Sequence, residues 1–417
     1  MFSGQLSGMA SPTLSPAVAA PACLTAAECT ADLIVFFQLE REILRYEAAW
    51  LAGVPYWDAK LKIGEHLLED AQHGETLLKR LHELKAASAE HKQTPGVDEM
   101  LRAFSATASG DEWLHGLYGV LKPWLAAQLR DYLAHSDSLM DVPTHQAIRR
   151  ILTDLDAQIA WFADYTPIFS PWEQPDVSAW LARLRAIAAS AAVRDGQVSG
   201  LQIDAGTPKD FTAFAGVRRD RTFKLASVRD PKYTATPEQG LEERRFAIFY
   251  NHTQEMQFAE SLGAVLFETA EMPWAYHHDI ARHISDEVRH SRMGQERLEQ
   301  LGYRLADMPM LTQNYEFRTH MDPLERFCLM TLVMEASGFE VKRANIAFFK
   351  ANQDEVSVRY ADYDVRDEML HVNLGHAWVP IMLRVYHDSR SVTETVEHCR
   401  TSIAGLTTEY PTAARRI

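Results

Sequence analysis

The stretches Asp286-Glu287-Val288-Arg289-His290 and Asp367-Glu368-Met369-Leu370-His371 decide which fold this 417-residue chain is expected to adopt. In both, a Glu precedes a His by three residues, and the two copies lie 81 residues apart. Residues three apart on a helix share one face, so the carboxylate and the imidazole of each pair can reach one ion. Two such pairs, each with a carboxylate-bearing helix upstream, are the minimum set for a two-metal site inside a four-helix bundle.

The composition is ordinary for a globular protein and disfavours two classes of partner. Hydrophobic residues make up 47% of the chain, yet the longest apolar runs are far shorter than the roughly 20 residues that span a bilayer. We therefore expect no membrane partner. The 42 basic and 57 acidic residues give a net charge of −15, which opposes a general phosphate-binding surface, so a nucleic acid is not expected either.

The cysteines and the motif content narrow the class further. Four cysteines without a zinc-like spacing, and an N-terminal stretch without a basic signal region, favour a reducing, cytoplasmic compartment. No Gly-x-Ser-x-Gly nucleophile motif and no glycine-rich phosphate loop occurs in the sequence. Hydrolases with a serine nucleophile and nucleotide-dependent enzymes are disfavoured accordingly.

Helical spacing of apolar residues, interrupted by glycines and prolines, divides the chain into five predicted parts. The parts are a disordered leader (1–30), an N-terminal helical bundle (31–165), a connector with one short helix (166–240), a second bundle (241–390) and an irregular tail (391–417). The helices expected in the second bundle span 241–269, 274–301, 322–351 and 354–387. This order of helices places one Glu-x-x-His motif on the second helix and one on the fourth.

The N-terminal bundle looks like a diverged copy of the C-terminal one. Asp70-Ala71-Gln72-His73 falls where the first Glu-x-x-His motif falls in the C-terminal half, but the position of the second motif reads Leu155-Asp156-Ala157-Gln158. The third helix, near Lys122, supplies no Glu at the required distance. We therefore expect an all-α fold of two four-helix bundles, of which the N-terminal one is degenerate as a metal site.

Each Glu-x-x-His motif needs a carboxylate from the preceding helix, about thirty residues upstream. The first motif is preceded by Glu255 and Glu260, and the second by Glu335 and Glu340. Both spacings repeat, so spacing alone does not choose between them. Glu335 lies in an apolar run, where an unpaired carboxylate is costly, whereas Glu340 has basic neighbours. We predict Glu255 and Glu335 as ligands, and Glu260 and Glu340 as supporting or additional ligands.

The predicted metal ligands are Glu255, Glu287, His290, Glu335, Glu368 and His371. Carboxylates with a few imidazoles suit two Fe ions, with an Fe/Mn pair or Mn as alternatives. His283, one turn before the first motif, is a further candidate ligand. Asp286 and Asp367 are each expected to accept the other N–H of a ligating His from the opposite helix. Arg289 and Arg366 are expected to neutralise excess carboxylate charge.

These residues resemble the ferritin-like superfamily, the di-iron carboxylate four-helix bundles. Three stretches, 252–260, 286–293 and 335–340, together with 366–371, look like an uncharacterised bacterial family described only as a ferritin-like domain of unknown function. The resemblance covers about residues 245–385. It implies a carboxylate-bridged di-iron centre, or a mixed iron and manganese centre, in the C-terminal half.

The ligand set and the resemblance together predict an oxidoreductase. We expect a non-haem di-iron oxygenase or oxidase that activates O₂ to oxidise or hydroxylate a small organic substrate. Its expected partners are that substrate, O₂ and an external electron donor, with a homodimer as an open alternative for the assembly; no catalytic residue is assigned. The alternative functions are a rubrerythrin-like peroxidase, whose usual rubredoxin-like Cys₄ module has no counterpart in the sequence, and a non-catalytic metal-binding or scaffold bundle.

Overall fold

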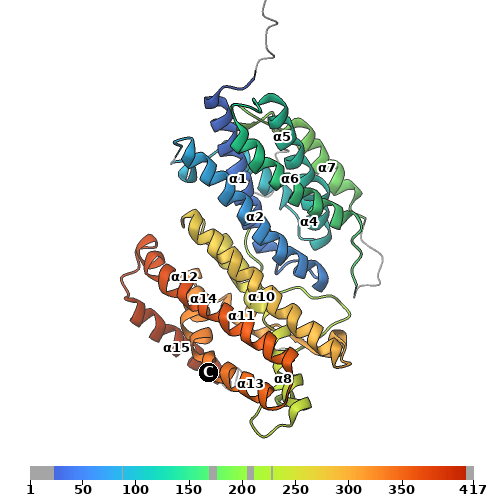
Figure 1. Ribbon diagram of the computed structural model, residues 1–417, viewed down its shortest axis with the longest axis vertical. Helices are drawn as coiled ribbons and strands as arrows, with labels where there is room; N and C mark the ends of the chain where they lie inside the picture. The colour runs from blue at the N-terminus through green and yellow to red at the C-terminus, as the bar shows by residue number, and fades with distance from the viewer. Residues whose placement is uncertain (1–22, 87, 169–175, 204–210, 227–228, 410–417) are drawn as a thin grey trace, which may run out of the picture.

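The computed structural model of the chain is built mostly of α-helices, as the sequence predicts (Figure 1). The structure describes residues 23–86, 88–168, 176–203, 211–226 and 229–409. Within these residues, strands are limited to four short segments. No helix in the described part of the chain combines the length and the apolar character that a bilayer crossing requires.

The N-terminal half is organised around two long helices, α1 (Ala26–Trp50) and α2 (Trp57–Glu83), that pack against each other. α1 begins at a capping box in which Thr25 and Glu28 exchange hydrogen bonds. Residues 26–30 of the predicted leader are therefore helical, and residues 1–22 lie outside the described residues.

The remaining elements of this half cover the long helix pair. They are η1 (Ala89–His91), α3 (Val97–Phe104), α4 (Gly110–Gly116), the π-helical segment η2 (Leu117–Leu121), α5 (Lys122–His135) and α6 (Val142–Ala163). α4, η2 and α5 follow one another without a break, so a single rod contains a widened turn that ends at Lys122.

The connector contains the one helix that the sequence predicts, α7 (Ser178–Ser190), and also short strands. β1 (Ala192–Arg194) and β2 (Gln197–Ser199) form a hairpin whose turn residues Asp195 and Gly196 both have positive φ. Asp-Gly is the pair that such a turn favours, so this hairpin was readable from the sequence. η3 (Pro231–Tyr233) follows, and β3 (Lys224–Ala226) pairs in parallel with the distant β4 (Pro309–Leu311).

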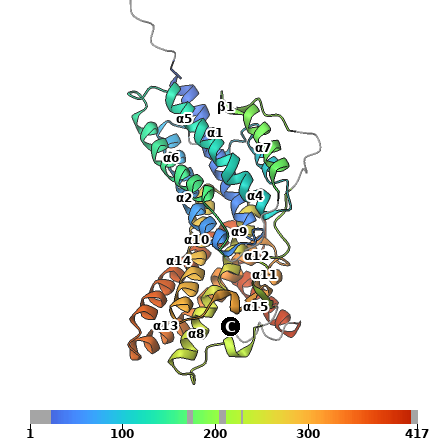
Figure 2. The same ribbon diagram turned by 90° about the vertical axis from the view of Figure 1, so that its right-hand side faces the viewer.

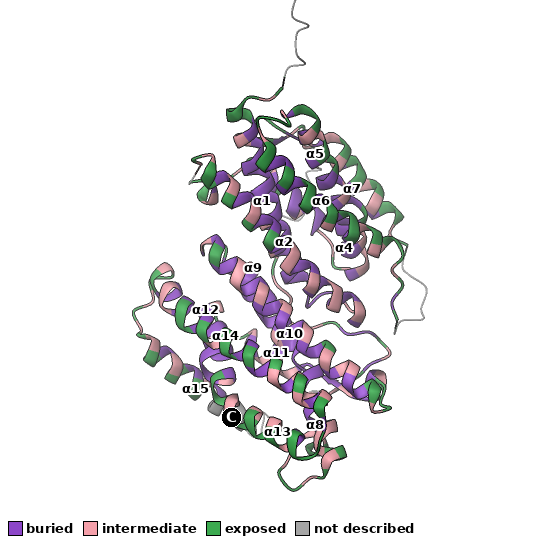
Figure 3. Ribbon diagram, viewed as in Figure 1, coloured by how far each residue is buried: buried purple, intermediate pink, exposed green. Residues whose placement is uncertain are grey.

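The C-terminal half holds the helices that carry the predicted ligands. They are α8 (Leu241–Thr253), α9 (Met256–Glu268), α10 (Trp274–Gln300), α11 (Gln313–Arg318), α12 (Pro323–Cys328), the π-helical segment η5 (Leu329–Glu335), α13 (Ala336–Ala351), α14 (Glu355–Val385) and α15 (Val392–Glu409). A short turn, η4 (Leu305–Asp307), precedes β4. Figure 3 shows α10 buried along most of its length, whereas α13 carries many exposed residues.

Three details differ from the predicted elements. The expected helix 241–269 breaks at residues 254–255, where the side chain of Gln254 accepts a hydrogen bond from the backbone N–H of Leu311. The expected helix 322–351 contains η5, which ends at Glu335. The tail predicted as irregular over 391–417 is wrong for residues 392–409, which form α15; residues 410–417 lie outside the described residues.

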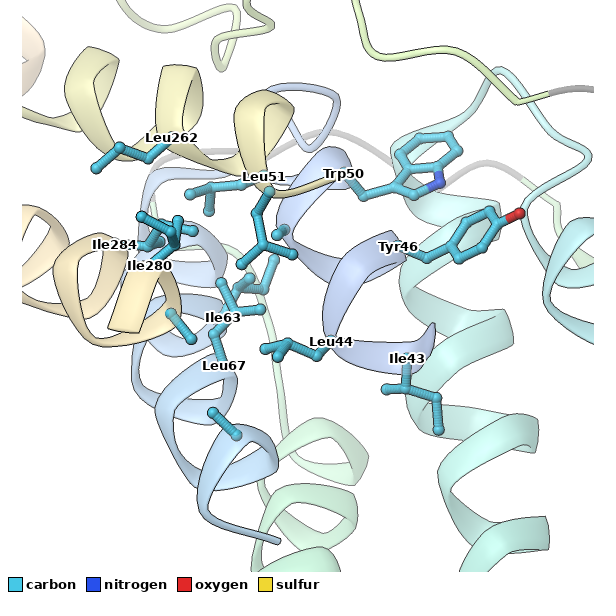
Figure 4. Packing of buried hydrophobic residues seen from close by; sticks show 14 of the residues in the cluster. Ile43, Leu44, Tyr46, Trp50, Leu51, Ile63, Leu67, Leu262, Ile280 and Ile284 are labelled. Carbon is cyan, nitrogen blue, oxygen red and sulfur yellow. The ribbon is translucent and has the colours of Figure 1, made fainter. Parts of the chain in front are cut away.

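The two halves share an apolar interface in which α2 packs along α10 and α1 packs along α9 (Figures 1 and 2). Figure 4 shows side chains from both halves meeting there, among them Leu44 of α1, Ile63 of α2 and Ile284 of α10. The approach of α2 to α10 is close enough to require glycine, because a Cβ on Gly64 would lie 2.6 Å from Cβ of Val288. This contact fixes α10 next to Glu287, at the centre of the predicted site.

Candidate metal centre

α10 supplies three of the candidate ligands from one face. His283, Glu287 and His290 follow one another at intervals of four and three residues, and all three side chains are buried. This spacing keeps them on one helical stripe, so their polar ends point toward the same interior space. Burial of two imidazoles and a carboxylate in one stripe is costly unless other polar groups or a cation meet them.

The first cluster joins α10 to η5 and α14. One ligand atom from each of His283, Glu287, Glu335 and His371 lies within 4.8 Å of the others. Nε2 of His283 is 3.0 Å from Oε1 of Glu335, and Nδ1 of His371 is 3.4 Å from Oε1 of Glu287. Two imidazoles and two carboxylates of three chain segments therefore surround one small volume.

The second cluster adjoins the first and shares Glu287 with it. Glu255, Glu287 and His290 form one group, and His290 forms another with Asp364 and Glu368. Nδ1 of His290 is 3.4 Å from Oε2 of Glu255 and 4.0 Å from Oε1 of Glu287. The carboxylate of Glu287 thus lies between the two clusters, in the position that a bridging ligand occupies.

The structure brings all six predicted ligands into these overlapping clusters, together with the further candidate His283. Several inward-facing atoms lack a hydrogen-bond partner within the described protein: Glu255 Oε2, Glu287 Oε1, His290 Nδ1, Glu335 Oε2, His371 Nδ1 and His283 Nδ1. Buried polar atoms are almost always paired, and the pairing of carboxylate and imidazole atoms by a cation satisfies both types. The residues present therefore fit a pair of metal ions.

Two aspartates hold the outer edges of the imidazoles, each across the helix pair α10 and α14. Nε2 of His290 lies 3.2 Å from Oδ2 of Asp367, and Nε2 of His371 lies 3.4 Å from Oδ2 of Asp286. With Nε2 occupied in this way, Nδ1 of each ring faces the cluster. Arg289 donates to both Asp286 and Asp367 at 2.7 Å, which links the two supports.

Burial and the neighbouring charges shift the protonation of the cluster residues. Burial, together with the carboxylates of Glu335, Asp364 and Glu287, raises the pKa of Glu368 to about 8. Burial acts to lower the pKa of His371, but the charge of Glu335 and the contacts with Asp286 and Glu287 raise it to about 10. Protons therefore occupy part of the metal-free site, which is the state expected of ligands that a cation would deprotonate.

Residues 176–415 match the family described as "Protein of unknown function (DUF455)". This span is more than half of the 417 residues. The chain belongs to this family. The matched DUF455 segment contains both clusters, whereas α1 to α6 lie outside it. No curated protein and no solved structure matches the chain.

Two residues of the DUF455 segment that the sequence did not single out complete the second cluster. Lys342 of α13 lies with Nζ 2.7 Å from Oδ1 of Asp364 and 2.7 Å from Oε1 of Glu368. Asp364 precedes Glu368 by four residues, so its helical spacing was a readable signal. Nε2 of His252 also lies 3.6 Å from Oδ2 of Asp364, which adds a third imidazole to this side.

Glu260 does not join either cluster, which corrects its assignment as an additional ligand. Its carboxylate is buried between Lys60 of α2 and Arg219 of the connector, and Nη2 of Arg219 donates to Oε2 at 2.8 Å. Both oxygens of Glu260 are thereby satisfied by cationic side chains. These partners come from outside the C-terminal helices, so the residue serves the contact between the two halves of the protein.

Glu340 and Arg366 also lie away from the clusters. Glu340 is exposed on α13, because the face of this helix that meets α14 is the one that carries Lys342. Arg366 is exposed and pairs with Asp362 at 3.1 Å on its own helix, so its predicted role in neutralising the site is wrong. Arg289 does take the predicted position, through its bonds to the two supporting aspartates.

A buried arginine outside the predicted set approaches the first cluster. Arg318 of α11 is buried, its guanidinium carbon lies 4.0 Å from the ring centroid of Phe258, and Nη2 lies 3.4 Å from the sulfur of Met334. Burial lowers the pKa of Arg318 to about 10, while the charges of Glu287 and Glu335 act in the opposite direction. Its positive charge therefore offsets part of the carboxylate excess in the first cluster.

A surface cleft of about 630 Å³ lies between the two halves, away from both clusters. Residues of α2, the end of α6 and α10 line it, among them Trp161, Tyr165 and Arg292. No ligand candidate borders this cleft. The clusters are thus enclosed by side chains from their own helices.

Proposed function

We propose that this protein is a non-haem di-iron oxygenase or oxidase that uses O₂ to oxidise or hydroxylate a small organic substrate. Its C-terminal half would be a ferritin-like four-helix bundle, and its N-terminal half a second, degenerate bundle. The observation that carries the proposal is the pair of buried clusters that share the carboxylate of Glu287, with unpaired ligand atoms facing inward. Such a carboxylate-rich, imidazole-containing set is what hard cations such as Fe²⁺ select.

The residues divide into two ligand groups around the shared Glu287. Glu335, His371 and His283 would hold one ion, and Glu255 and His290 would hold the other, with Glu368 beside them. When bound, two ferrous ions supply electrons for the reduction of O₂, and an external donor would restore them. The remaining chemistry falls to the side chains that shape and charge the site.

The supporting residues position the ligands and keep water out. Asp286 and Asp367 hold the outer nitrogens of the imidazoles, so that Nδ1 of each ring faces the cluster. The ammonium of Lys342 holds Glu368 beside Asp364 and lowers the cost of placing two carboxylates together. Buried Leu332 and Val333 of η5 surround Glu335 with apolar surface, which excludes solvent from the reacting volume.

Iron counting tests the binding step before any turnover. Metal-free protein titrated with Fe²⁺ under anaerobic conditions should bind about two equivalents per chain, and the His371→Gln variant should lose at least one. The matched control is His376→Gln, an exposed histidine on the same helix, which should bind like the wild type. Wild-type protein that binds no iron would contradict the metal centre and leave a scaffold function.

Exposure of the ferrous protein to O₂ then separates the functions that bind iron. Consumption of O₂ in a fixed ratio to the oxidation of added organic substrates supports the oxygenase or oxidase. Consumption of hydrogen peroxide in preference to O₂ supports the rubrerythrin-like alternative. Accumulation of ferric oxide well beyond two ions per chain indicates storage and contradicts the proposed enzyme.

A further inference from the structure

A third group of ligand-type residues lies in the N-terminal half, outside the segment that matches the family. Glu40 of α1 and Asp70 and His73 of α2 place one ligand atom each within 4.8 Å of one another. Nδ1 of His73 is 3.4 Å from Oε1 of Glu40 and 3.8 Å from Oδ1 of Asp70. The sequence pointed to Asp70 and His73, but Glu40 emerges only from the packing of α1 against α2.

The polar atoms of this group are buried and lack partners. Glu40, Asp70 and His73 are exposed to only 1%, 0% and 3%. Both carboxylate oxygens of Glu40 and Nδ1 of His73 have no hydrogen-bond partner within the described protein. A buried carboxylate in this state is costly unless a cation meets it. The unpaired atoms face one another, so a single ion between them would satisfy all three.

The same triplet occurs in the second cluster of the C-terminal half. Glu40 precedes Asp70 by 30 residues, as Glu255 precedes Glu287 by 32, and a His follows three residues later in both. The outer support is also repeated. Oδ2 of Asp154 on α6 lies 3.3 Å from Nε2 of His73, which turns Nδ1 of that ring toward Glu40.

The position of the first cluster is filled differently. Lys122 directly follows the π-helical segment η2, and Gln158 comes 36 residues later, the same interval as from Glu335 to His371. Nζ of Lys122 donates to Oδ2 of Asp70 at 2.8 Å and to Oε1 of Gln158 at 2.6 Å. A fixed ammonium therefore replaces one cation and its ligands, and leaves the other ligand triplet intact.

The charges of this interior leave room for one divalent ion. Three buried carboxylates, those of Glu40, Glu47 and Asp70, face the single ammonium of Lys122, whose Nζ is also 3.4 Å from Oε2 of Glu47. With His73 neutral, the sum is two negative charges. A divalent cation cancels this excess, and three protein ligands of one nitrogen and two oxygens are enough to bind it with water completing the shell.

We propose that the N-terminal half binds one divalent transition-metal ion through Glu40, Asp70 and His73, with the ammonium of Lys122 in place of a second ion. This site is separate from the proposed di-iron centre and does not depend on it. The mixture of imidazole and carboxylate suits Zn²⁺, Mn²⁺, Fe²⁺ and Co²⁺, of which Co²⁺ provides a visible absorption spectrum.

Co²⁺ titration of full-length protein tests the proposal in a background that lacks the C-terminal centre. The double variant Glu335→Gln/His371→Gln should retain one tightly bound Co²⁺ per chain, counted by equilibrium dialysis and metal analysis. Adding His73→Gln should abolish this ion and its absorption bands. The matched control is His145→Gln, another buried histidine of the N-terminal half, whose Nε2 is 2.8 Å from Oγ of Ser136. This control should keep the ion.

A milder variant keeps the test valid if His73→Gln fails to fold. Asp154 is partly exposed, and its change to Asn should raise the Kd for Co²⁺ by about 10- to 100-fold while the circular dichroism stays unchanged. An absence of bound Co²⁺ in the double variant, or a Kd that Asp154→Asn leaves unaltered, would overturn the N-terminal site. Failure of the C-terminal centre gives a different result, because wild-type protein would then bind a single ion that His73→Gln removes.

Discussion

Nε2 of His290 on α10 lies 3.2 Å from Oδ2 of Asp367 on α14, so a carboxylate of one helix orients the imidazole of the other. The reverse contact joins His371 of α14 to Asp286 of α10 at 3.4 Å. Each helix therefore supplies both a ligand and the support for its neighbour's ligand. This reciprocal arrangement ties the orientation of the two imidazoles to the packing of one helix pair.

The aspartate supports should matter for metal affinity more than for folding. Asp367→Asn removes the charge that strengthens the bond to His290, so we expect the affinity for one of the two Fe²⁺ ions to fall by about 10- to 100-fold. Anaerobic Fe²⁺ titration measures this change. Asp362→Asn is the control, since Asp362 is half exposed and pairs only with Arg366 on the same helix. Equal losses in both variants would contradict the supporting role.

Glu260 and Glu335 should respond in opposite ways to the same substitution. Glu260→Gln leaves Lys60 and Arg219 without their buried carboxylate, so we expect the free energy of unfolding to fall by about 3–5 kcal/mol with the iron count unchanged. Glu335→Gln should lower the iron count instead. Urea denaturation and metal analysis of both variants measure the two effects. Loss of iron in the Glu260→Gln protein would return this residue to the ligand set.

The close approach of α2 and α10 should tolerate no side chain at Gly64. In the Gly64→Val variant the new atoms would overlap Val288, and we expect a loss of stability of about 1–3 kcal/mol or more. Because Val288 follows Glu287, iron binding should weaken as well. Thermal denaturation and Fe²⁺ titration measure these effects. Gly119→Ala is the control, because a Cβ at Gly119 meets no atom within 4 Å, and it should leave both properties close to those of the wild type.

The outcome for the site shows which information a sequence carries locally. The two Glu-x-x-His motifs lie within single helices, so their ligand faces follow from helical periodicity alone. The apolar run around Glu335 correctly separated it from Glu340, which is exposed. Local signals were also overlooked. Ser391 and Glu394 exchange the hydrogen bonds of a capping box, which begins α15 where the Ser/Thr content had suggested an irregular tail.

Other features depend on contacts that no local pattern reveals. The same 27- and 28-residue spacings that made Glu260 and Glu340 alike hid the fact that Lys60, 200 residues from Glu260, reaches its carboxylate. Lys342 was associated with Glu340 by proximity in sequence, but it pairs with Asp364 and Glu368 of the next helix. Such pairings are set by the packing of helices against each other.

The buried ammonium of Lys60 should produce a specific dependence of stability on pH. Burial lowers the pKa of Lys60 to about 7, from 10.5 in an exposed lysine. Between these two pH values the unfolded chain binds more protons at this residue than the folded chain, so its contribution to stability rises with pH. We expect the increase in Tm between pH 7 and pH 9 to be smaller in Lys60→Met than in the wild type. Identical slopes in the two proteins would contradict this assignment.

Loss of Lys122 should destabilise the N-terminal half. In the Lys122→Met variant the carboxylates of Glu47 and Asp70 would remain buried without their shared ammonium, and we expect a loss of about 3–5 kcal/mol in the free energy of unfolding. Urea denaturation followed by circular dichroism measures it. Lys62→Met, which removes a partly exposed lysine paired with Glu65, should change stability by less than about 0.5 kcal/mol. A Lys122→Met protein as stable as this control would show that the carboxylates do not need the ammonium.

The apolar seam between the halves sets the minimal folding unit of this protein. The matched family segment begins at residue 176, yet Leu262, Ile280 and Ile284 on α9 and α10 are covered by side chains of α1 and α2 (Figure 4). A fragment that starts at this boundary would present these side chains to water. We expect it to self-associate or precipitate, because a continuous apolar strip on a helix pair seeks another surface. The N-terminal helices therefore act as a permanent, covalently tethered lining for the metal-bearing half.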